Sequence, residues 1–245
     1  MRISICIPMY NENRVIAETA KTLSSYMETH FADYEILFCS DGSTDGCDKT
    51  VEALALPHVR VIGYPQNRGK GCAVRTAMLE ATGDIRLFTD ADLAYGTDVI
   101  EQVYQIFLNG GREVQVVIGS RNLHKDGYEG YTVLRKLMSK TYLRVLSLVG
   151  GFRLSDSQCG CKAFSGEAAR EIFSRCETDG FAFDFEALLW ANKLKLPIWE
   201  FPAKVINHGE SKVRLLRDTA KMLRDLMRMR RRIRKTAVEP LSQKD

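Results

Sequence analysis

The first half of the chain alternates short β-rich runs with amphipathic runs of helical length. The β-rich runs lie at 3–8, 34–39, 59–63, 85–89 and 114–119, and the helical runs lie at 13–28, 45–55, 70–81 and 97–108. This alternation predicts an α/β fold, in which helices cover both faces of a mostly parallel sheet. In such sheets ligands bind beyond the carboxyl ends of the strands. The residues that follow each β-rich run are therefore the first candidates for a site.

The second half has a different organisation. A helical run at 131–149 is followed by a Cys- and Gly-rich connection at 154–162, helical runs at 166–175 and 183–194, a β-like run at 197–206 and a last helical run at 212–235. With 245 residues and 45% hydrophobic content, the chain can bury a sizeable core. We expect one domain over 1–211, with halves at 1–121 and 122–211, followed by a basic amphipathic helix and tail at 212–245.

The strongest chemical signal is the pair Asp90 and Asp92, directly after the β-rich run 85–89. Side chains two positions apart on an extended chain point the same way, so two carboxylates are aimed at one point beyond a strand end. Mg²⁺ commonly uses one or two carboxylates together with substrate phosphates. The triplet D-x-D is common, and taken alone it is more often a solvated acidic turn than a metal site.

Two other strand ends also carry polar side chains. Asp41 follows the run 34–39, where an acidic side chain can accept hydrogen bonds from a base or ribose; a turn or helix cap is the alternative. After the first run, Tyr10 offers a ring that can stack on a base, and Glu12 offers a carboxylate for a nucleoside. Their alternative is a turn and a first-turn Glu that the helix dipole favours.

A glycine-rich turn with the sequence NRGKG occupies residues 67–71, before a helical run. Its two glycines allow a close backbone approach, and Lys70 and Arg75 supply positive charge for a diphosphate. Neither the Walker spacing nor the G-x-G-x-x-G pattern is present. The sequence thus argues against an ATPase and against a nicotinamide enzyme.

Taken in order, PMYNE (8–12), SDGSTD (40–45), NRGKG (67–71) and DAD (90–92) resemble the four signatures of the inverting glycosyltransferases with the GT-A fold. The resemblance covers residues 1–121. It implies a GT-A, Rossmann-like sheet, a nucleotide diphosphate sugar as donor, and Mg²⁺ or Mn²⁺ as cofactor. It further implies that Asp90 and Asp92 hold the metal. The residues implied to bind the nucleotide sugar are Pro8, Tyr10, Glu12, Asp41, Lys70 and Asp90.

Further segments resemble the polyprenyl-phosphate sugar synthases. GSR (119–121) and LRK (134–136) with Ser139 are similar to the dolichyl-phosphate mannose synthases, whereas KGCAVR (70–75), DSQCGCK (156–162) and FDFE (183–186) are closer to the dolichyl-phosphate glucosyltransferases. HGESK (208–212) resembles the closing loop of both groups. The resemblance implies catalytic roles for Asp92, Asp184 and Lys212. Ala94 stands where the mannose synthases have a third metal ligand.

This subfamily transfers a hexose to dolichyl or undecaprenyl phosphate, so the resemblance implies a nucleotide-sugar half at 1–121 and an acceptor half at 122–211. UDP-glucose is the favoured donor, and GDP-mannose is the alternative. A rival acceptor is a saccharide or protein hydroxyl, which would need a general base. A phosphomonoester is mostly a dianion at neutral pH and needs none.

Arg121, Arg135 and Ser139 are the candidates for binding the acceptor phosphate. Arg135 and Ser139 are four residues apart and so share one face of the predicted helix. Arg recognises phosphate through bidentate, charge-assisted bonds. Ordinary surface charge on an amphipathic helix is the alternative.

Positive charge is concentrated near the end of the chain. Residues 212–235 hold eleven Lys or Arg against two Asp, whereas residues 1–211 carry a net charge of −4. Val213, Leu216, Ala220, Leu223 and Met227 recur at helical spacing there. A basic amphipathic helix can lie on an anionic membrane surface without crossing it; packing of this helix on the domain is the alternative.

We therefore expect a cytoplasmic enzyme that is bound peripherally to the membrane. No apolar run approaches the roughly 20 residues that cross a bilayer. The seven cysteines include no C-x-x-C pair, which favours a reducing compartment. A nucleotide- or RNA-binding module without enzymatic activity remains the other class. The absence of aromatic residues in 228–235 argues against nucleic acid as a partner.

Overall fold

The computed structural model describes residues 1–127, 143, 146–147, 150–151, 153–206 and 226–238 of the chain. Within them, seven strands form one sheet in the order β3-β2-β1-β4-β6-β5-β7. The strands are β1 (Ile3–Met9), β2 (Tyr34–Asp41), β3 (Val59–Tyr64), β4 (Ile85–Phe88), β5 (Val116–Ser120), β6 (Lys162–Ser165) and β7 (Ile198–Pro202). The β3-β2-β1-β4 block is parallel, as is the pair β5-β7, and β6 runs antiparallel to both β4 and β5. The predicted mostly parallel α/β sheet is confirmed.

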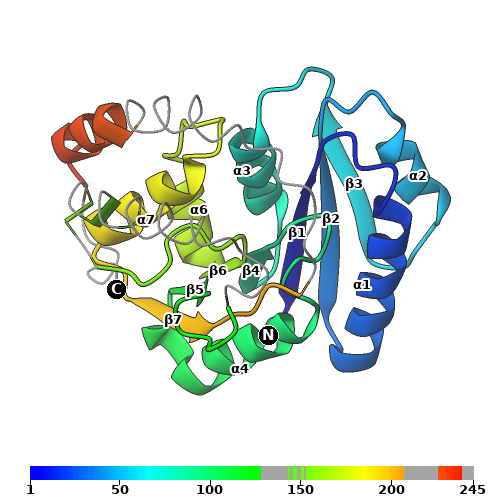
Figure 1. Cartoon of the computed structure of the whole chain (residues 1–245), viewed down its shortest axis with the longest axis horizontal. Helices are drawn as coiled ribbons and strands as arrows, with labels where there is room; N and C mark the ends of the chain where they lie inside the picture. Colours follow the sequence, from blue (N-terminus) through cyan, green and yellow to red (C-terminus); the bar gives the residue numbers. More distant parts are fainter. Residues whose placement is uncertain (128–142, 144–145, 148–149, 152, 207–225, 239–245) are drawn as a thin grey trace.

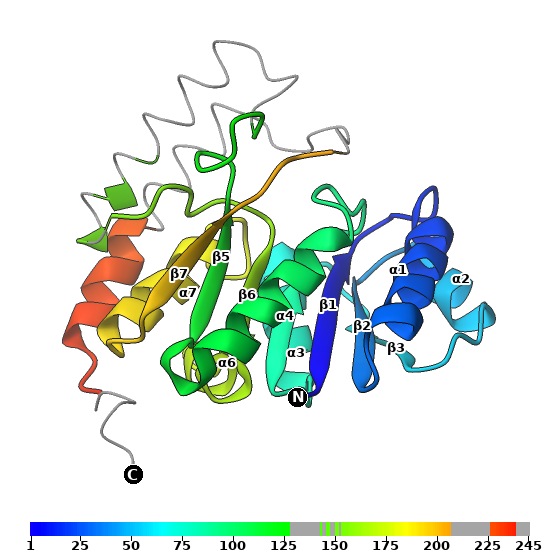
Figure 2. The same ribbon diagram turned by 90° about the horizontal axis from the view of Figure 1, so that it is seen from below.

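Helices cover both faces of this sheet (Figures 1 and 2). One face is covered by α1 (Ile16–His30), α2 (Cys47–Ala53) and α4 (Asp98–Gly110), and the other by α3 (Lys70–Glu80), α6 (Gly166–Phe173) and α7 (Phe183–Lys193). The 3₁₀ turn η1 (Gly111–Glu113) follows α4. Successive strand side chains alternate between faces, so Ile5 joins the core under α1 and Cys6 joins the core under α3. A strand that is buried on both faces reads as a continuous apolar run, and this made β1 and β2 easy to predict.

Strand β6 was missed by the sequence analysis. Residues 154–162 were expected to form a connection that leads directly into a helix, but Lys162–Ser165 form a strand between β4 and β5. The strand has four residues and begins with a fully buried lysine, Lys162. Neither alternation nor an apolar run marks so short a segment, and its partners lie far away along the chain.

A helix near the end of the chain packs onto the domain. A helix over residues 226–235 buries Leu226, Met229 and Ile233 in the same core as α6 and α7, and it lies beside α7 in both views (Figures 1 and 2). Met227, the last position of the predicted apolar stripe, is 62% exposed and lies beside the buried face, so the orientation of the stripe toward lipid or core stays a prediction. The other stripe positions, the boundary at 211/212 and most of the predicted helix 131–149 lie outside the described residues. Over the described part of the chain, no helix is both long and apolar enough to span a bilayer.

A buried carboxylate ties the amino-terminal ends of β1, β2 and β4 together. Glu35 on β2 is 4% exposed, and its Oε1 accepts hydrogen bonds from Ser4 Oγ at 2.6 Å and from the Thr82 backbone N–H at 2.6 Å. Arg60 Nη2 lies 3.3 Å from Oε2. Burial favours the neutral acid, but the hydrogen bonds outweigh it and lower the pKa of Glu35. The ionised form of Glu35 therefore stabilises the fold.

Replacing Glu35 with Gln should lower the free energy of unfolding near pH 7 by about 1.5–3 kcal/mol, which is typical of hydrogen bonds to a charged group. Because the pKa of Glu35 is lower in the folded state, its contribution is complete above the unfolded-state value of about 4.3 and is lost as the pH falls through the folded-state value. Urea unfolding at neutral and at strongly acidic pH measures this: wild type and Glu35→Gln should converge in acid. Glu52→Gln, at an exposed position of α2, is the matched control. A difference that is independent of pH would contradict the assignment.

Candidate functional site

The carboxyl ends of β1, β2 and β4 lie side by side because β1 stands between the other two. The loops after β1 and β2 are joined by hydrogen bonds: Asn11 Oδ1 accepts from the Thr44 backbone N–H at 2.8 Å, and the Asn13 N–H donates to Asp45 Oδ2 at 2.8 Å. Asn11 adopts a φ of 53°, which Asn tolerates better than most residues. The two loops therefore form one connected rim at the edge of the sheet.

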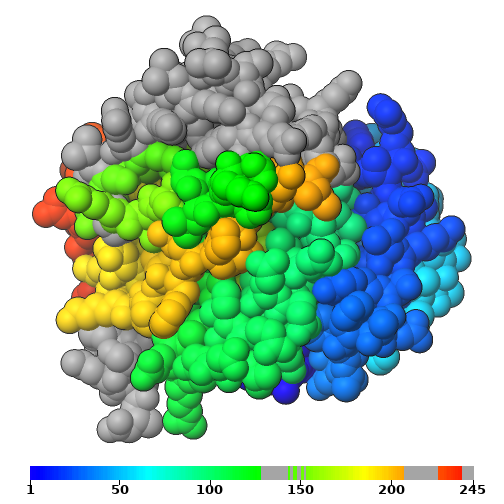
Figure 3. All heavy atoms as spheres, turned by 60° about the horizontal axis from the view of Figure 1, so that its bottom comes forward, coloured from blue at the N-terminus to red at the C-terminus, as the bar shows by residue number. Residues whose placement is uncertain are grey.

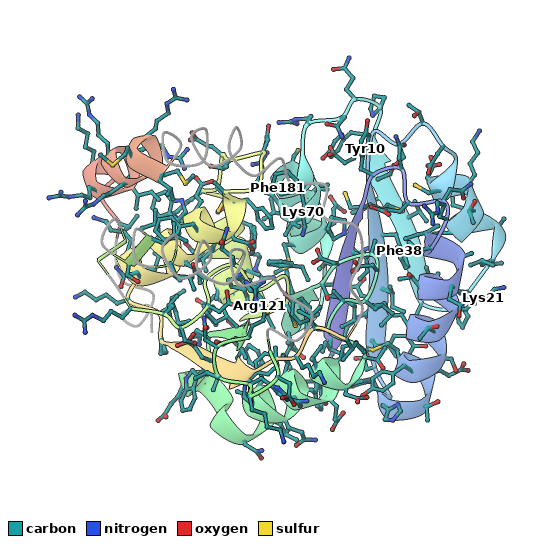
Figure 4. All side chains as sticks on the ribbon, viewed as in Figure 1. Tyr10, Lys21, Phe38, Lys70, Arg121 and Phe181 are labelled. Atoms are coloured by element: carbon teal, nitrogen blue, oxygen red, sulfur yellow. The ribbon has the colours of Figure 1, made fainter. Side chains whose placement is uncertain are left out.

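The residues predicted to bind a nucleoside are spread over this rim. Pro8 is buried within β1, Tyr10 is 41% exposed, and Glu12 is partly exposed at the start of the segment that leads into α1. In Figure 4, Tyr10 projects at the carboxyl end of β1, while Lys70 lies at the start of α3 and Arg121 lies after β5. Pro8, Tyr10 and Glu12 thus lie at the edge of the sheet formed by the strand ends, where the sequence predicted them.

Asp41 is 3% exposed, and its carboxylate is engaged by the glycine-rich turn. Oδ1 accepts from Tyr64 Oη at 2.7 Å and from the Arg68 backbone N–H at 2.8 Å. Oδ2 accepts from Asn67 Nδ2 at 2.9 Å and from the Gly69 N–H at 2.9 Å. The sequence analysis missed these contacts. They make Asp41 the residue that fixes the turn before Lys70, and its binding to a nucleotide stays a prediction.

The turn needs glycines because another segment of the protein packs closely against its backbone. A Cβ atom on Gly69, whose φ is +119°, would lie 2.4 Å from the backbone oxygen of Asp179, and one on Gly71 would lie 2.4 Å from that of Thr178. The sequence analysis expected these glycines to admit a ligand. In the structure they admit the segment 178–180, whose Asp179 oxygen accepts the Gly71 N–H at 2.8 Å.

A charged cluster occupies the carboxyl end of β4. The Lys70 ammonium is paired with Asp90, and Lys162 Nζ lies 3.0 Å from Asp184 Oδ1. Burial opposes the charged form of Lys70, but Asp90 and Asp184 outweigh it and raise its pKa. Burial and the neighbouring Asp90 raise the pKa of Asp92. The structure thus brings together four of the predicted site residues, Lys70, Asp90, Asp92 and Asp184, and adds Lys162; the roles of the four stay predictions.

Lys162 is fully buried and also donates to the Cys159 backbone oxygen at 2.5 Å. Burial raises the pKa of Asp184, although Lys162 and Lys70 oppose this rise. Lys162 ends the motif DSQCGCK (156–162), but the sequence alone indicated no role for it. The signal that would have found it is a lysine at the head of an otherwise apolar segment, because a buried lysine needs a carboxylate partner.

The Asp90 carboxylate fits against a glycine. A Cβ atom on Gly160 would lie 2.4 Å from Asp90 Oδ2, and the Gly160 N–H donates to Tyr95 Oη at 3.1 Å. Asp92 Oδ1 accepts the Ala94 N–H at 3.1 Å. Over the described part of the chain, no three His, Cys, Asp or Glu side chains form a group that could by themselves hold a metal ion. Any ion here would be held by two carboxylates and its substrate, a set that suits Mg²⁺.

Of the predicted acceptor residues, only Arg121 is described. Its Nε and Nη2 donate to Asp156 Oδ2 and Oδ1 at 2.6 and 2.9 Å, and Asp156 is fully buried. Burial opposes the charged form of Arg121, but this bidentate bond outweighs it and raises its pKa. Arg135, Ser139 and Lys212 lie outside the described residues. The sequence did not predict that the Arg121 guanidinium would be paired with Asp156.

A cleft of about 710 Å³ opens beside Asp92 and Tyr95, and basic side chains of Arg14, His124 and Lys204 contribute to its walls. Its far side is built by the segments that follow β5 and β7, which lie side by side on the face shown in Figure 3. The cleft therefore reaches from the metal-ligand candidates toward the second half of the chain.

Comparison with known proteins gives consistent results. Residues 4–173 match the family described as Glycosyl transferase family 2. A dolichyl-phosphate beta-glucosyltransferase of Drosophila melanogaster is 30% identical over 239 residues, covering 92% of this chain and 73% of that protein. Another, from Trichomonas vaginalis, is 30% identical over 220 residues and covers 85% of this chain. The chain spans 65% of that protein's length, slightly less than two thirds.

Among solved structures, glucosyl-3-phosphoglycerate synthase from Mycobacterium tuberculosis, in complex with Mn²⁺, UDP and phosphoglyceric acid, superimposes with a TM-score of 0.72 at 20% identity. The match covers 97% of this chain and 80% of that one. At this level of identity the likeness concerns the fold, and it confirms the predicted GT-A architecture. The sequence match, the sheet and the strand-end motifs agree, and the chain belongs to glycosyl transferase family 2.

Proposed function

We propose that this glycosyltransferase transfers glucose from UDP-glucose to the phosphate of a polyprenyl lipid such as dolichyl or undecaprenyl phosphate, with inversion at the anomeric carbon. The observation that carries the proposal is the cluster of Lys70, Asp90, Asp92 and Asp184 at the carboxyl ends of the strands. The Drosophila and Trichomonas relatives, both dolichyl-phosphate beta-glucosyltransferases, support the choice of sugar and acceptor.

The donor site that we propose follows the rim of the sheet. Tyr10 and Pro8 line the nucleoside position, with Glu12 and Asp41 as hydrogen-bond acceptors. The Lys70 ammonium, raised in pKa by the surrounding carboxylates, faces the diphosphate. Because Asp41 fixes the turn from 67 to 69, it also fixes the point from which the Lys70 side chain starts.

A divalent cation, Mg²⁺ or Mn²⁺, fits the charge of this cluster. Two lysines, Lys70 and Lys162, face three carboxylates, Asp90, Asp92 and Asp184, so the cluster carries one net negative charge when all are ionised. We propose that Asp90 and Asp92 hold the ion, which would supply Lewis-acid stabilisation to the departing diphosphate. A protein of the same fold is solved with Mn²⁺ and UDP, which supports this choice.

A phosphate acceptor removes the need for a general base, because a phosphate dianion is already a nucleophile. We therefore assign Asp184, held by Lys162, to the orientation of the sugar hydroxyls beside the reacting carbon. Arg121, Arg135 and Ser139 remain our proposal for the acceptor phosphate, and Lys212 for catalysis. For Arg121, the pairing with Asp156 makes Arg121→Ala a poor test, since that change leaves a buried carboxylate without its partner.

We further propose that the helix over 226–235 holds the enzyme peripherally at an anionic membrane surface. Leu226, Met229 and Ile233 face the core, whereas Arg228, Arg234 and Lys235 are exposed. Anionic headgroups attract such residues by about 1 kcal/mol each near the surface. The inner face of the helix thus belongs to the domain, and the outer face is available to lipid.

The reaction itself is tested by incubating the protein with Mg²⁺ or Mn²⁺, a short-chain polyprenyl phosphate, and either UDP-glucose or GDP-mannose. We expect kcat/KM to be higher with UDP-glucose and EDTA to abolish turnover. The matching polyprenyl alcohol is the control acceptor. Equal transfer to the alcohol would reject the phosphate acceptor, and a higher kcat/KM with GDP-mannose would reject the donor.

The geometry at Asp90 gives a separate test of the metal proposal. Gly160→Ala places a methyl group against Asp90 Oδ2 and should displace that carboxylate. We expect the concentration of Mn²⁺ at half-maximal activity to rise by about tenfold, the effect of losing roughly 1.4 kcal/mol of binding. Gly180→Ala is the matched control, because a Cβ there meets no atom within 4 Å. An unchanged Mn²⁺ requirement in Gly160→Ala would speak against Asp90 as a ligand.

Membrane attachment is tested by changing Arg228, Arg234 and Lys235 together to Gln. Binding to vesicles that contain anionic lipid should weaken by about 3 kcal/mol at low salt, while turnover of a water-soluble acceptor stays the same. Changing the exposed Lys21, Lys49 and Arg112 to Gln removes the same charge elsewhere on the surface. Vesicle flotation that is equal for both triple variants would rule out this helix as the anchor. Deleting the segment is not equivalent, because Met229 and Ile233 belong to the core.

A further inference from the structure

A second buried carboxylate, Glu186, lies on α7 outside the cluster described above. It is fully buried, and it accepts hydrogen bonds from the backbone N–H groups of Glu177 at 3.1 Å and of Thr178 at 2.7 Å. Glu186 therefore fixes the segment that precedes α7. A buried carboxylate of this kind needs a cation as well as hydrogen bonds.

That cation is supplied by the C-terminal helix. Arg232 donates from Nη2 to Glu186 and pairs through Nη1 with Glu177, while its Nη2 also lies 3.4 Å from the backbone oxygen of Arg175. One guanidinium thus contacts both ends of the short segment 175–177 and the carboxylate that holds it. Arg232 is the side chain through which this basic helix joins the interior.

The segment fixed in this way reaches the donor turn. The Asp179 backbone oxygen accepts from the Gly71 N–H at 2.8 Å and from the Cys72 N–H at 3.3 Å, at the first turn of α3. The Asp179 carboxylate lies 2.6 Å from Arg75 Nη2. Gly69 and Gly71 have no room for a side chain against 178–179, so a displacement of that segment is transmitted to the backbone on either side of Lys70.

We propose that Arg232 is a positioning residue for the donor site: by balancing Glu186 it holds the segment 177–179, which in turn sets the position of Lys70. This inference deepens the proposed function, on which it rests for the role of Lys70 toward the diphosphate. It gives the basic C-terminal helix a part in donor binding that is separate from any contact with lipid.

The geometry predicts a local effect when Arg232 is removed. Arg232→Met keeps the apolar stem of the side chain but leaves the Glu186 carboxylate buried without a cation. The bonds from the Glu177 and Thr178 N–H groups then have to loosen. Glu186→Gln removes the charge that needs balancing, so the double variant Arg232→Met/Glu186→Gln should restore the segment. Arg231→Met, on the exposed side of the same helix, is the matched control.

Hydrogen–deuterium exchange tests the coupling without any ligand. In Arg232→Met, a peptide covering 68–74 should exchange about tenfold faster than in wild type, because local opening releases the Gly71 and Cys72 amides. A peptide from β1, the Arg231→Met control and the double variant should match wild type. Unchanged exchange at 68–74, or an equal acceleration in the β1 peptide, would overturn the proposal.

Calorimetric titration with UDP and Mn²⁺ then separates positioning from a general loss of folded protein. We expect the Kd for UDP in Arg232→Met to rise about tenfold with an unchanged stoichiometry, and the double variant to recover the wild-type Kd. A reduced stoichiometry with an unchanged Kd would overturn the positioning role. A wild-type protein that binds no UDP would instead reject the proposed donor, and the exchange result would still decide whether Arg232 controls this turn.

Discussion

Carboxylates inside a protein stay ionised only where cations or N–H groups face them, because the interior solvates charge poorly. Around this site each of four carboxylates has such a partner. Asp41 is faced by the amides of the glycine-rich turn, Asp90 by Lys70, Asp184 by Lys162, and Glu186 by Arg232. Each pair joins elements that are distant along the chain. The loops at the edge of the sheet are therefore held in place before a substrate arrives, which is the condition for electrostatic stabilisation without reorganisation.

The same pairing explains why the two halves of the chain form one site. The first half supplies Asp41 and Asp90 from strand ends and Lys70 from the start of α3, and the second supplies Lys162 and Asp184 from β6 and α7. The two sets also act on each other, since the charged form of Lys70 is stabilised by Asp184 as well as by Asp90. Contact between the earlier and the later part of the chain is thus a matter of charge as much as of apolar packing.

The sequence was most informative where one local rule decides the structure. Buried parallel strands produce apolar runs, so β1 and β2 were found, and Asp90 and Asp92 were placed at a strand end. The sequence was least informative where the surroundings of a residue depend on a partner that is distant along the chain. Nothing near Gly69 reveals that Asp179 will approach it, and nothing near Arg121 reveals Asp156. The core also decides which face of the C-terminal helix is buried, since Leu226 lies in it whereas the neighbouring Met227 is exposed.

The late position of β6 in the chain also sets an order of assembly. The strands β1 to β4 can pair as soon as they are made, but β5 has no neighbour until β6, and β6 is encoded after it. Long-range pairing of this kind is slow, and an unpaired strand edge invites association with other chains. During synthesis, the edge of β4 therefore stays open until residues 162–165 emerge. The four-residue strand that carries Lys162 then pairs with both β4 and β5, and the charged cluster is complete only when Asp184 on α7 has followed.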